Sequence, residues 1–416
     1  MKKVILFIGL LLLGFTSCDN VVEVDHPVVD PSDFLSQTTP IPDYSKKIMD
    51  GVYSVVKGSD KYGEQVVLKW SGTNLSILSS KDVGYFVMQG GSLDSVIFLM
   101  GYWRFRVNSE TGPANFYISR EEGGSKLLSG DTTNSTIILR GSYGNGTNLP
   151  NEPVVLQYLR PFSDYVKQSD FYILAHRGGG RNSEYLGVSE NSIEMINLAE
   201  GYGATGIEID IHVSTDGVAF LYHDSDINLR LTQKSVIWGK VEDFSWAQLR
   251  TFIKLKNGED IPTLREALEF VLEHTSLRFV WLDLKSGKDE IPLVREIQKE
   301  ILERAATMNR DLKIVLGLPV EDKVNNLLAY PDYQNIPSLC ELDVSLVQKV
   351  NSQFWAPRWT QGTQTDLVRQ MHSEGRKAFV WTLDEPAFIQ SFINEGEFDG
   401  ILTNYPSLVA YYHYIR

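Results

Sequence analysis

Cysteine is scarce in this sequence. The 416 residues include two cysteines, Cys18 and Cys340, which excludes a framework of several disulfide bridges. Cys340 lies in the apolar segment 338–342, where a buried small hydrophobic side chain is the simplest interpretation. Hydrophobic residues make up 43% and charged residues 22% of the chain, which excludes wholesale disorder, a collagen and a coiled coil. The length fits two domains, or one large domain with an appendage.

Positive charge is also in deficit. The chain has 39 Lys and Arg residues against 53 Asp and Glu residues, a formal net charge of −14. A nucleic acid would be repelled on average, and the sequence contains no basic patch that would reverse this, so no nucleic-acid partner is expected. An acidic protein can still bind a small phosphate ester when a cation lies between the two negative charges.

Long apolar runs are missing beyond the N-terminus, so no later segment is expected to span a membrane. Two lysines precede the apolar run Val4–Phe15, which has the length of a signal-peptide core. The run leads to a Thr-Ser-Cys sequence that resembles the lipobox of bacterial lipoproteins, with Phe15 where Leu is usual. We therefore expect residues 1–18 to be a signal peptide, Cys18 to carry lipid, and the protein to be exported and anchored to the periplasmic or cell-surface face of a bacterial membrane. A simple secretory signal with an incidental cysteine is the alternative.

The next two segments differ in pattern. Residues 19–43 contain four prolines and are expected to form a linker, because proline disfavours a helix or a central strand. Residues 44–162 are expected to form a small all-β domain, a sandwich or a barrel, since β-branched and aromatic runs alternate with turn signals. The expected strands are Val52–Lys57, Gln65–Trp70, Asn74–Leu78, Tyr85–Gln89, Val96–Val107, Asn115–Ser119, Thr136–Arg140 and Val154–Leu159. No convergent cluster of titratable residues occurs here, which favours a binding or spacer module over an enzyme.

Residues 171–416 alternate short apolar strands with amphipathic helices. This pattern predicts an α/β fold of the TIM type, a (β/α)8 barrel, following the all-β domain. The eight expected strands are Tyr172–Ala175, Gly206–His212, Val218–Tyr222, Arg278–Leu284, Lys313–Leu318, Ser338–Leu342, Lys377–Leu383 and Gly400–Thr403. The expected helices include Ser192–Glu200, Thr263–Glu273, Ile291–Met308 and Leu367–Glu374.

Acidic residues collect at the carboxyl ends of the early strands, where such barrels place their active sites. Glu208 and Asp210 are two apart on one expected strand, so their side chains share a face. Asp283 and Lys285 repeat this spacing two expected strands further on, and Asp283 offers a third carboxylate. Clustered carboxylates repel one another unless a cation lies between them, and oxygen ligands favour Ca²⁺ or Mg²⁺, with Mn²⁺ as a further candidate.

Two histidines lie close to these carboxylates in the expected barrel. His176 follows the first expected strand and His223 the third. In-line displacement at phosphorus needs a general base and a general acid, and two histidines supply both near neutral pH. Arg177 and Lys285 offer positive charge to phosphate oxygens. The pattern therefore predicts a phosphodiester reaction.

Four other polar or aromatic residues of this region have more than one interpretation. We expect Glu190 to accept from backbone amides rather than to bind metal, and Asp224 to orient His223 or its loop. His212 is expected to be structural or to support the site. Trp381 fits a wall of the substrate site and a core position equally well.

The C-terminal segment resembles the glycerophosphodiester phosphodiesterase family over roughly residues 171–416. The resemblance rests on His176-Arg177-Gly178, Glu190-Asn191-Ser192, Gly206–Asp210, Thr215-Asp216-Gly217, His223-Asp224, Ile261–Leu264, Val380-Trp381-Thr382 and Asp399–Pro406. It implies a (β/α)8 barrel that hydrolyses glycerophosphodiesters to glycerol 3-phosphate and an alcohol. It implies that His176 and His223 are the acid–base pair, that Glu208 and Asp210 bind the metal, and that Arg177 and Lys285 contact phosphate. Asp283 stands where the family usually has Glu, and Ser192 where it usually has Thr.

Two other interpretations fit the same residues. A lyase of the phosphatidylinositol phospholipase C or sphingomyelinase D type would also use two histidines and would release a cyclic phosphate. A surface lipoprotein with an inactive binding barrel would use no chemistry at all. The expected partners are a small glycerophosphodiester substrate and, through the lipid anchor, a membrane. The sequence predicts neither the alcohol head group nor the oligomeric state.

Overall fold

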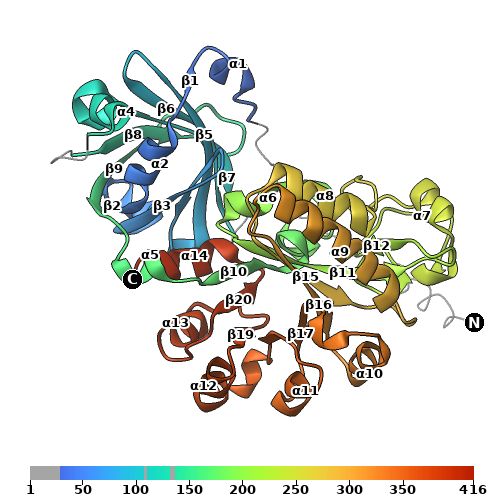
Figure 1. Ribbon diagram of the computed structural model, residues 1–416. Helices are drawn as coiled ribbons and strands as arrows, with labels where there is room; N and C mark the ends of the chain where they lie inside the picture. The colour runs from blue at the N-terminus through green and yellow to red at the C-terminus, as the bar shows by residue number, and fades with distance from the viewer. Residues whose placement is uncertain (1–28, 107–109, 132–135) are drawn as a thin grey trace, which may run out of the picture.

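The computed structural model describes residues 29–106, 110–131 and 136–416, and it contains two closed β-sheets that pack side by side (Figure 1). The N-terminal sheet is antiparallel, and the C-terminal sheet is a parallel barrel surrounded by helices. The predicted signal peptide 1–18 and the lipidation of Cys18 lie outside the described residues. Within the part of the chain that is described, every helix is too short or too polar to cross a membrane.

The N-terminal sheet is an eight-stranded up-and-down barrel, so the expected all-β unit is confirmed and of the two expected architectures the barrel is the one present. Each strand pairs with the next along the chain, and the last strand pairs back with the first. The strands are β2 (Gly51–Lys57), β3 (Gln65–Ser71), β4 (Asn74–Leu78), β5 (Gly84–Leu93), β6 (Val96–Phe105), β7 (Thr111–Ile118), β8 (Ile138–Tyr143) and β9 (Glu152–Arg160). Closure leaves no free edge between these eight strands.

Aromatic side chains fill the interior of this barrel. Trp103 and Phe116 are buried within it, and Tyr62 packs against Trp103 edge to face with 6.1 Å between ring centroids. The indole Nε1 of Trp103 donates to the carbonyl oxygen of Gly144 at 2.7 Å. The interior is therefore a packed core, as is usual for a barrel of eight strands.

The segment expected to be a linker joins the fold within its described part, residues 29–43. It contains the short helix α1 (Ser32–Leu35) and the strand β1 (Thr39–Pro40), which pairs with β5. A further helix, α2 (Asp43–Met49), follows directly after Pro42. The prolines are tolerated because they stand just before helices or in an edge strand, where no amide donor is needed.

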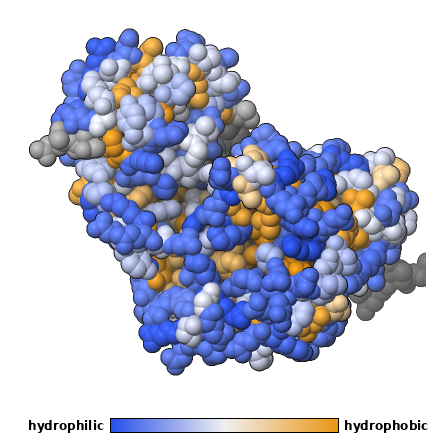
Figure 2. All heavy atoms as spheres, viewed as in Figure 1, coloured by the Kyte–Doolittle hydropathy of each residue, from blue (hydrophilic) through white to orange (hydrophobic). Residues whose placement is uncertain are grey.

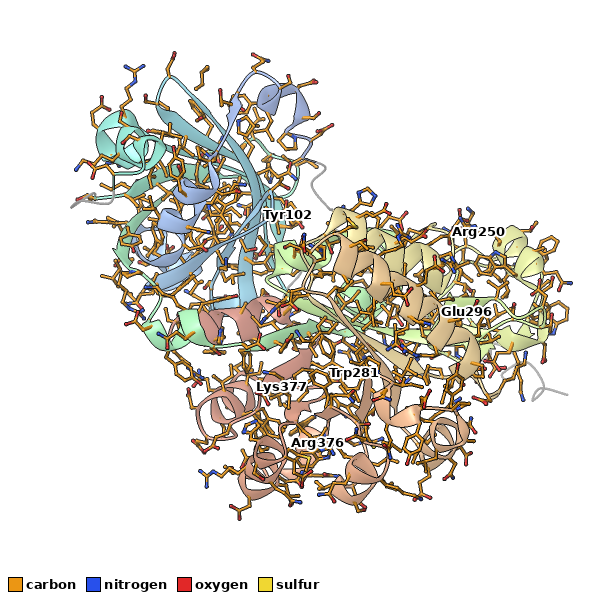
Figure 3. The ribbon with its side chains drawn as sticks, viewed as in Figure 1. Tyr102, Arg250, Trp281, Glu296, Arg376 and Lys377 are labelled. Atoms are coloured by element: carbon orange, nitrogen blue, oxygen red, sulfur yellow. The ribbon has the colours of Figure 1, made fainter. Side chains whose placement is uncertain are left out.

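The C-terminal sheet is the expected (β/α)8 barrel, with eight parallel strands and a helix after each (Figure 1). The strands are β10 (Tyr172–Ala175), β11 (Gly206–Val213), β15 (Phe279–Leu284), β16 (Lys313–Leu318), β17 (Ser338–Cys340), β18 (Phe354–Trp355), β19 (Lys377–Val380) and β20 (Gly400–Thr403). The helices that cover them are α6 (Ile193–Ala199), α8 (Leu264–His274), α9 (Ile291–Thr307), α10 (Glu321–Ala329), α11 (Val344–Lys349), α12 (Thr365–Ser373), α13 (Pro386–Asn394) and α14 (Pro406–Tyr414). Trp281 lies inside the barrel, where it is buried with other aromatic side chains (Figure 3). Cys340 is buried in β17 and, as expected, behaves as a small hydrophobic residue; burial raises the pKa of its thiol to about 11.

One expected barrel strand is wrong. The segment Val218–Tyr222 contains β12 (Ala219–Leu221), which folds back as a hairpin and pairs antiparallel with β11. The strand that takes its place among the eight is β18, which lies between β17 and β19. Its two residues are too few to show a periodic pattern in the sequence. Consequently β15 pairs directly with β11, and Asp283 lies opposite Asp210 rather than two strands away.

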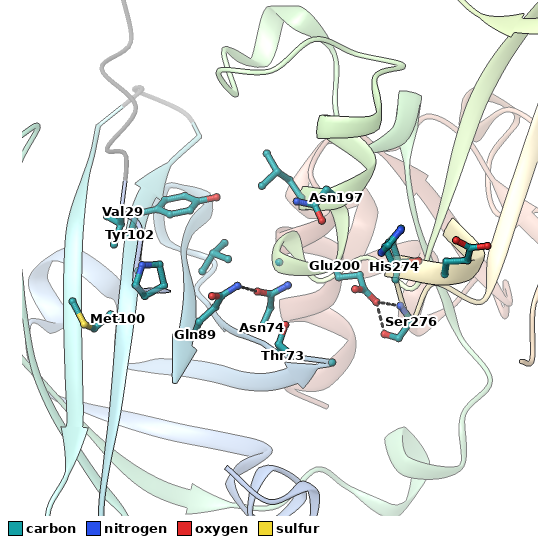
Figure 4. A pocket seen from close by; sticks show the side chains of 18 residues that line it. Val29, Thr73, Asn74, Gln89, Met100, Tyr102, Asn197, Glu200, His274 and Ser276 are labelled. Atoms are coloured by element: carbon teal, nitrogen blue, oxygen red, sulfur yellow. Dashed lines mark hydrogen bonds between the residues drawn. The ribbon is translucent and has the colours of Figure 1, made fainter. Parts of the chain in front are cut away.

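The two barrels share an interface that is partly apolar and partly polar. Tyr85 of β5 packs against Tyr202 with 5.3 Å between ring centroids, and the hydroxyl of Ser76 donates to the carbonyl oxygen of Gly201 at 2.9 Å. A cavity of about 490 Å³ opens between the two units near Tyr102 and Glu200 (Figure 4). The space-filling view shows a hollow between two mostly hydrophilic lobes (Figure 2). The accessory barrel is therefore packed against the parallel barrel.

Candidate functional site

Three buried carboxylates meet on neighbouring strands of the parallel barrel. Glu208 and Asp210 of β11 and Asp283 of β15 each offer an oxygen, and these oxygens lie within 4.8 Å of one another. Their side chains share one face because alternate residues of a strand point the same way. The intervening Ile209 is fully buried on the opposite face. The structure thus brings together the three residues that the sequence predicts as metal ligands.

One oxygen of each carboxylate is left without a partner. Glu208 Oε1, Asp210 Oδ1 and Asp283 Oδ1 are buried and have no hydrogen-bond partner among the described residues. Burial, and then the charges of Asp210 and Asp283, raise the pKa of Glu208 well above its ordinary value. Burial also raises the pKa of Asp283, although Lys285 opposes the effect. A buried carboxylate oxygen that accepts no hydrogen bond lowers the stability of the fold. This donor set therefore fits a hard divalent cation, which would bind all three of these oxygens.

Lys285 balances part of the negative charge. Its Nζ lies 2.5 Å from Asp283 Oδ2 and 3.6 Å from Asp210 Oδ1. Burial alone would raise the pKa of Asp210. The positive charges of Lys285, His223 and Arg177 outweigh this effect, so the pKa of Asp210 lies below its ordinary value. The same carboxylates raise the pKa of Lys285 against the effect of burial, so the ammonium stays charged beside the cluster.

His176 follows β10 and is held in one tautomer. Its Nδ1 lies 2.8 Å from Asn404 Oδ1, and the Nδ2 group of Asn404 donates to Asp384 Oδ2 at 2.7 Å. Because the amide nitrogen of Asn404 is used by Asp384, its oxygen must accept from His176 Nδ1–H. The Nε2 atom therefore carries the free lone pair, and it lies 3.8 Å from Glu208 Oε2. Burial, and then Arg177, lower the pKa of His176 to about 3, which keeps the ring neutral.

His223 has a charged partner instead. Its Nδ1 lies 2.7 Å from Asp224 Oδ1, and Arg230 Nη2 donates to the same oxygen at 2.6 Å. Burial raises the pKa of Asp224, but hydrogen bonds from Arg230 and His223 lower it well below its usual range. Asp224 is thus an ionised acceptor that orients His223, as expected. Asp224 and the side-chain amide of Asn404 thus each hold the Nδ1 atom of one histidine ring.

Arg177 braces the cluster from the loop after β10. Its backbone amide donates to Glu208 Oε2 at 2.9 Å, and its Nη1 donates to Glu190 Oε1 at 2.5 Å. The backbone of Arg177 has a φ of +54°, an uncommon conformation for a residue with a side chain. Glu190 also accepts from the amide of Asn182 at 2.8 Å, so it supports the loop and lies outside the carboxylate cluster.

Asn191 supports the cluster directly, whereas His212 contacts a residue outside it. Asn191 Nδ2 donates to Asp210 Oδ2 at 2.8 Å, and the amide of Asp210 donates back to Asn191 Oδ1 at 3.1 Å. The interpretation of His212 as a supporting residue agrees with its burial and with the 2.8 Å contact between its Nδ1 and Glu242 Oε1. Burial raises the pKa of Glu242, but the hydrogen bond to His212 contributes to lowering it to about 2.

Sequence reasoning missed further polar residues of the site. Asn404 and Glu341 each follow a barrel strand, β20 and β17, at the end where active sites lie. Glu341 Oε1 has no partner among the described residues, and burial, then Asp283, raise the pKa of this carboxyl well above its usual value. Their position after a strand was the available signal. Trp381 is half-buried, with the guanidinium of Arg358 4.8 Å from its ring centre.

Comparisons with known proteins find similarity to one family. The family model described as the glycerophosphoryl diester phosphodiesterase family matches residues 176–320, which include both histidines and all three carboxylates. The glycerophosphodiester phosphodiesterase of Caldanaerobacter subterraneus is 26% identical over 244 residues, 56% of this chain and 94% of that protein. Glycerophosphodiester phosphodiesterase 1 of Mus musculus is 35% identical over 150 residues, 33% of this chain and 40% of that protein. A crystal structure of a glycerophosphodiester phosphodiesterase from Parabacteroides distasonis aligns over 58% of this chain and 95% of its own, with 21% identity and a TM-score of 0.46.

Proposed function

We infer from the match over residues 176–320 that the chain belongs to the glycerophosphoryl diester phosphodiesterase family through its parallel barrel, and we propose that it hydrolyses glycerophosphodiesters to glycerol 3-phosphate and an alcohol. The observation that carries the proposal is the cluster of three buried carboxylates with unpartnered oxygens, with a histidine 3.8 Å from one of them. Such a donor set suits a cation, and a cation beside two histidines suits displacement at phosphorus.

Glu208, Asp210 and Asp283 would hold the divalent cation. Bound there, the cation would neutralise charge on the non-bridging phosphate oxygens as the transition state forms. Lys285 adds a second positive charge beside the same carboxylates, and Arg177 adds a third. Asp283 is one methylene shorter than the Glu usual in the family, but its direct pairing opposite Asp210 brings its oxygen into the cluster without that extra length.

The hydrogen-bond partners of the histidines divide the proton transfers between them. His176 has a neutral amide partner and a bare Nε2, so it accepts a proton from the attacking water. We assign the second transfer, donation of a proton to the leaving alcohol, to His223, whose Nδ1 lies 2.7 Å from Asp224 Oδ1. General acid–base catalysis of this kind typically contributes about 10²–10⁴-fold to the rate.

Product analysis tests the activity. Purified protein with Ca²⁺ or Mg²⁺ is incubated with glycerophosphodiesters of choline, ethanolamine, inositol and glycerol, and the products are followed by phosphorus NMR. The expected product is glycerol 3-phosphate. A persistent cyclic phosphate would support the lyase instead, and no turnover of any substrate would support an inactive binding barrel.

The location of the enzyme is a separate proposal that rests on the sequence alone. Lipid attached to Cys18 would tether the protein to a bacterial membrane after export. Expression in bacteria with a radioactive fatty acid should label the wild type and leave Cys18→Ala unlabelled. Labelling of that variant to the wild-type level would contradict lipidation at Cys18.

A further inference from the structure

Two arginines of the accessory barrel reach the loop that carries His176. They are Arg104, at the end of β6, and Arg106, just beyond it. We propose that the accessory barrel positions this catalytic loop, residues 176–186, through Arg104 and Arg106, and that full activity therefore requires both barrels. The inference rests on the proposed function, since it concerns the geometry of the same site.

Both arginines bind Glu184 of the loop. Arg104 Nη2 donates to the carbonyl oxygen of Glu184 at 3.0 Å, and Arg106 Nη2 lies 3.5 Å from Glu184 Oε2. The side chains of Arg106 and Glu184 are only 1% and 6% exposed, so the ion pair is shielded from water. Loss of Arg106 would remove the buried one of the two arginines that pair with Glu184, and losing a buried partner is more disruptive than losing a surface pair.

Arg106 also contacts a residue that follows β20, the strand next to β10. Its guanidinium lies 4.0 Å from the ring centre of Tyr405, a cation–π contact. Tyr405 directly follows Asn404, the residue that accepts from His176 Nδ1. One arginine of the accessory barrel therefore bridges the loop after β10 and the residues after β20.

A continuous set of polar contacts connects Glu184 to His176. Arg181 Nη2 binds Glu184 Oε1 at 2.7 Å, the oxygen that Arg106 leaves free, and lies 4.0 Å from Asp384 Oδ2. Asp384 accepts from the backbone amide of Asn404 at 2.8 Å and from its side-chain amide. Displacement of Glu184 would thus shift Arg181 and Asp384, and with them the amide that fixes the tautomer of His176.

The loop itself has little regular structure to hold it in place. It contains two short 3₁₀ turns, His176–Gly178 and Asn182–Glu184, and two side-chain-bearing residues with positive φ, Arg177 at +54° and Tyr185 at +50°. Such backbone conformations are costly and persist when surrounding contacts impose them. Arg106 packs closely against this loop. A Cβ atom added to Gly180 would lie only 3.4 Å from Arg106 Nη2.

Kinetics of Arg106 variants test the positioning role. Arg106→Ala should lower kcat by about 10–100-fold, because small displacements of catalytic groups cost about that much. The KM should change by less than about threefold, since residue 106 lies outside the proposed phosphate-binding groups. Arg106→Lys, which keeps the charge over Tyr405, should recover part of kcat. Arg160→Ala is the matched control, because Arg160 also crosses between the barrels, to the carbonyl oxygen of Ile415 at the chain's end.

Coupling and hydrogen exchange complete the test. Glu184→Gln should lower kcat as Arg106→Ala does, and the double variant should lose little more than either single one. Amides of residues 176–186 should exchange faster in Arg106→Ala than in the wild type or in Arg160→Ala. Wild-type kcat and exchange in Arg106→Ala, or equal losses of kcat in Arg106→Ala and Arg160→Ala, would overturn the inference. If the wild type cleaves no diester, the proposed function fails, and the exchange comparison still decides whether Arg106 positions the loop.

Discussion

Glu208 carries a buried carboxylate whose pKa is raised by burial and by two neighbouring carboxylates. A folded-state pKa above the unfolded value means that the folded protein binds the proton more tightly. In the metal-free protein, the contribution of Glu208 to the free energy of unfolding should therefore be greatest below the unfolded pKa, about 4.3, and fall as the pH rises toward the folded pKa. The residue that serves the cation is thus a source of instability without it.

Replacing this carboxylate by an amide should remove the effect. Metal-free Glu208→Gln is expected to be more stable than the metal-free wild type at pH 7, because the amide carries no charge to bury. Urea denaturation between pH 4 and pH 8, after treatment with EDTA, measures the difference. With saturating divalent cation the order should reverse, because only the wild type gains the full binding energy. Equal stability of the metal-free wild type and metal-free Glu208→Gln across this pH range would contradict the raised pKa.

The unequal partners of His176 and His223 predict unequal responses to the leaving group. An alkoxide needs a proton to leave, whereas a nitrophenolate leaves almost unaided. Activity of His223→Ala, which we propose to lack the acid, should fall about 10²–10⁴-fold on a glycerol diester and much less on a nitrophenyl phosphodiester. His176→Ala, which lacks the base, should fall by similar factors on both substrates.

Steady-state turnover of both variants on both substrates measures this difference. Rescue of His176→Ala instead of His223→Ala would exchange the two roles. Near-normal turnover of either variant on the glycerol diester would show that this histidine is structural.

At the scale of secondary structure, the strands of both barrels were largely predictable, but their order in the parallel barrel was not. Seven of the eight parallel strands overlap predicted ones, because each is a buried apolar run between helices. The two-residue strand β18 has no such run, and β12 resembles a barrel strand although it folds back on β11. Because β12 lies outside the ring of parallel strands, β11 pairs directly with β15, and the sequence pattern did not predict this pairing.

The same distinction holds for the site. Residues placed by a strand, such as Glu208, Asp210 and Asp283, were predictable from their spacing and end up together. Residues placed by contacts between distant segments were not. Arg106 is separated from Glu184 by 78 positions and belongs to the other barrel, so no local pattern could connect the two.

Helix α8 offers a test at this scale. Thr263, part of the segment Ile261–Leu264 quoted for the family resemblance, caps the helix in a capping box with Glu266. Thr263→Ala should lower the free energy of unfolding by about 0.5–2 kcal/mol and leave kcat unchanged, because the cap lies in the helix layer. Urea denaturation and turnover measure the two quantities. Thr307→Ala, at the end of α9, is the control and should change stability less. A loss of kcat without a loss of stability would show that Thr263 acts in the site.

For the molecule as a whole, an acidic chain with a cluster of three carboxylates has to bind the negatively charged substrate that we propose. With a net charge of −14, the protein repels a phosphodiester at long range, so local positive charge has to bring substrate and site together. Lys285, Arg177 and the proposed cation supply it. The accessory barrel holds the loop that presents His176 to this centre.

The proposed metal dependence is tested by titrating metal-free enzyme with Ca²⁺ or Mg²⁺, with binding measured by calorimetry and diester turnover followed in parallel. We expect no turnover in EDTA and a rise in turnover that follows the occupancy of one site. We also expect Glu208→Gln and Asp210→Asn to weaken both binding and turnover by at least about tenfold. Full activity in excess EDTA, or wild-type metal affinity in both variants, would contradict the proposed metal dependence.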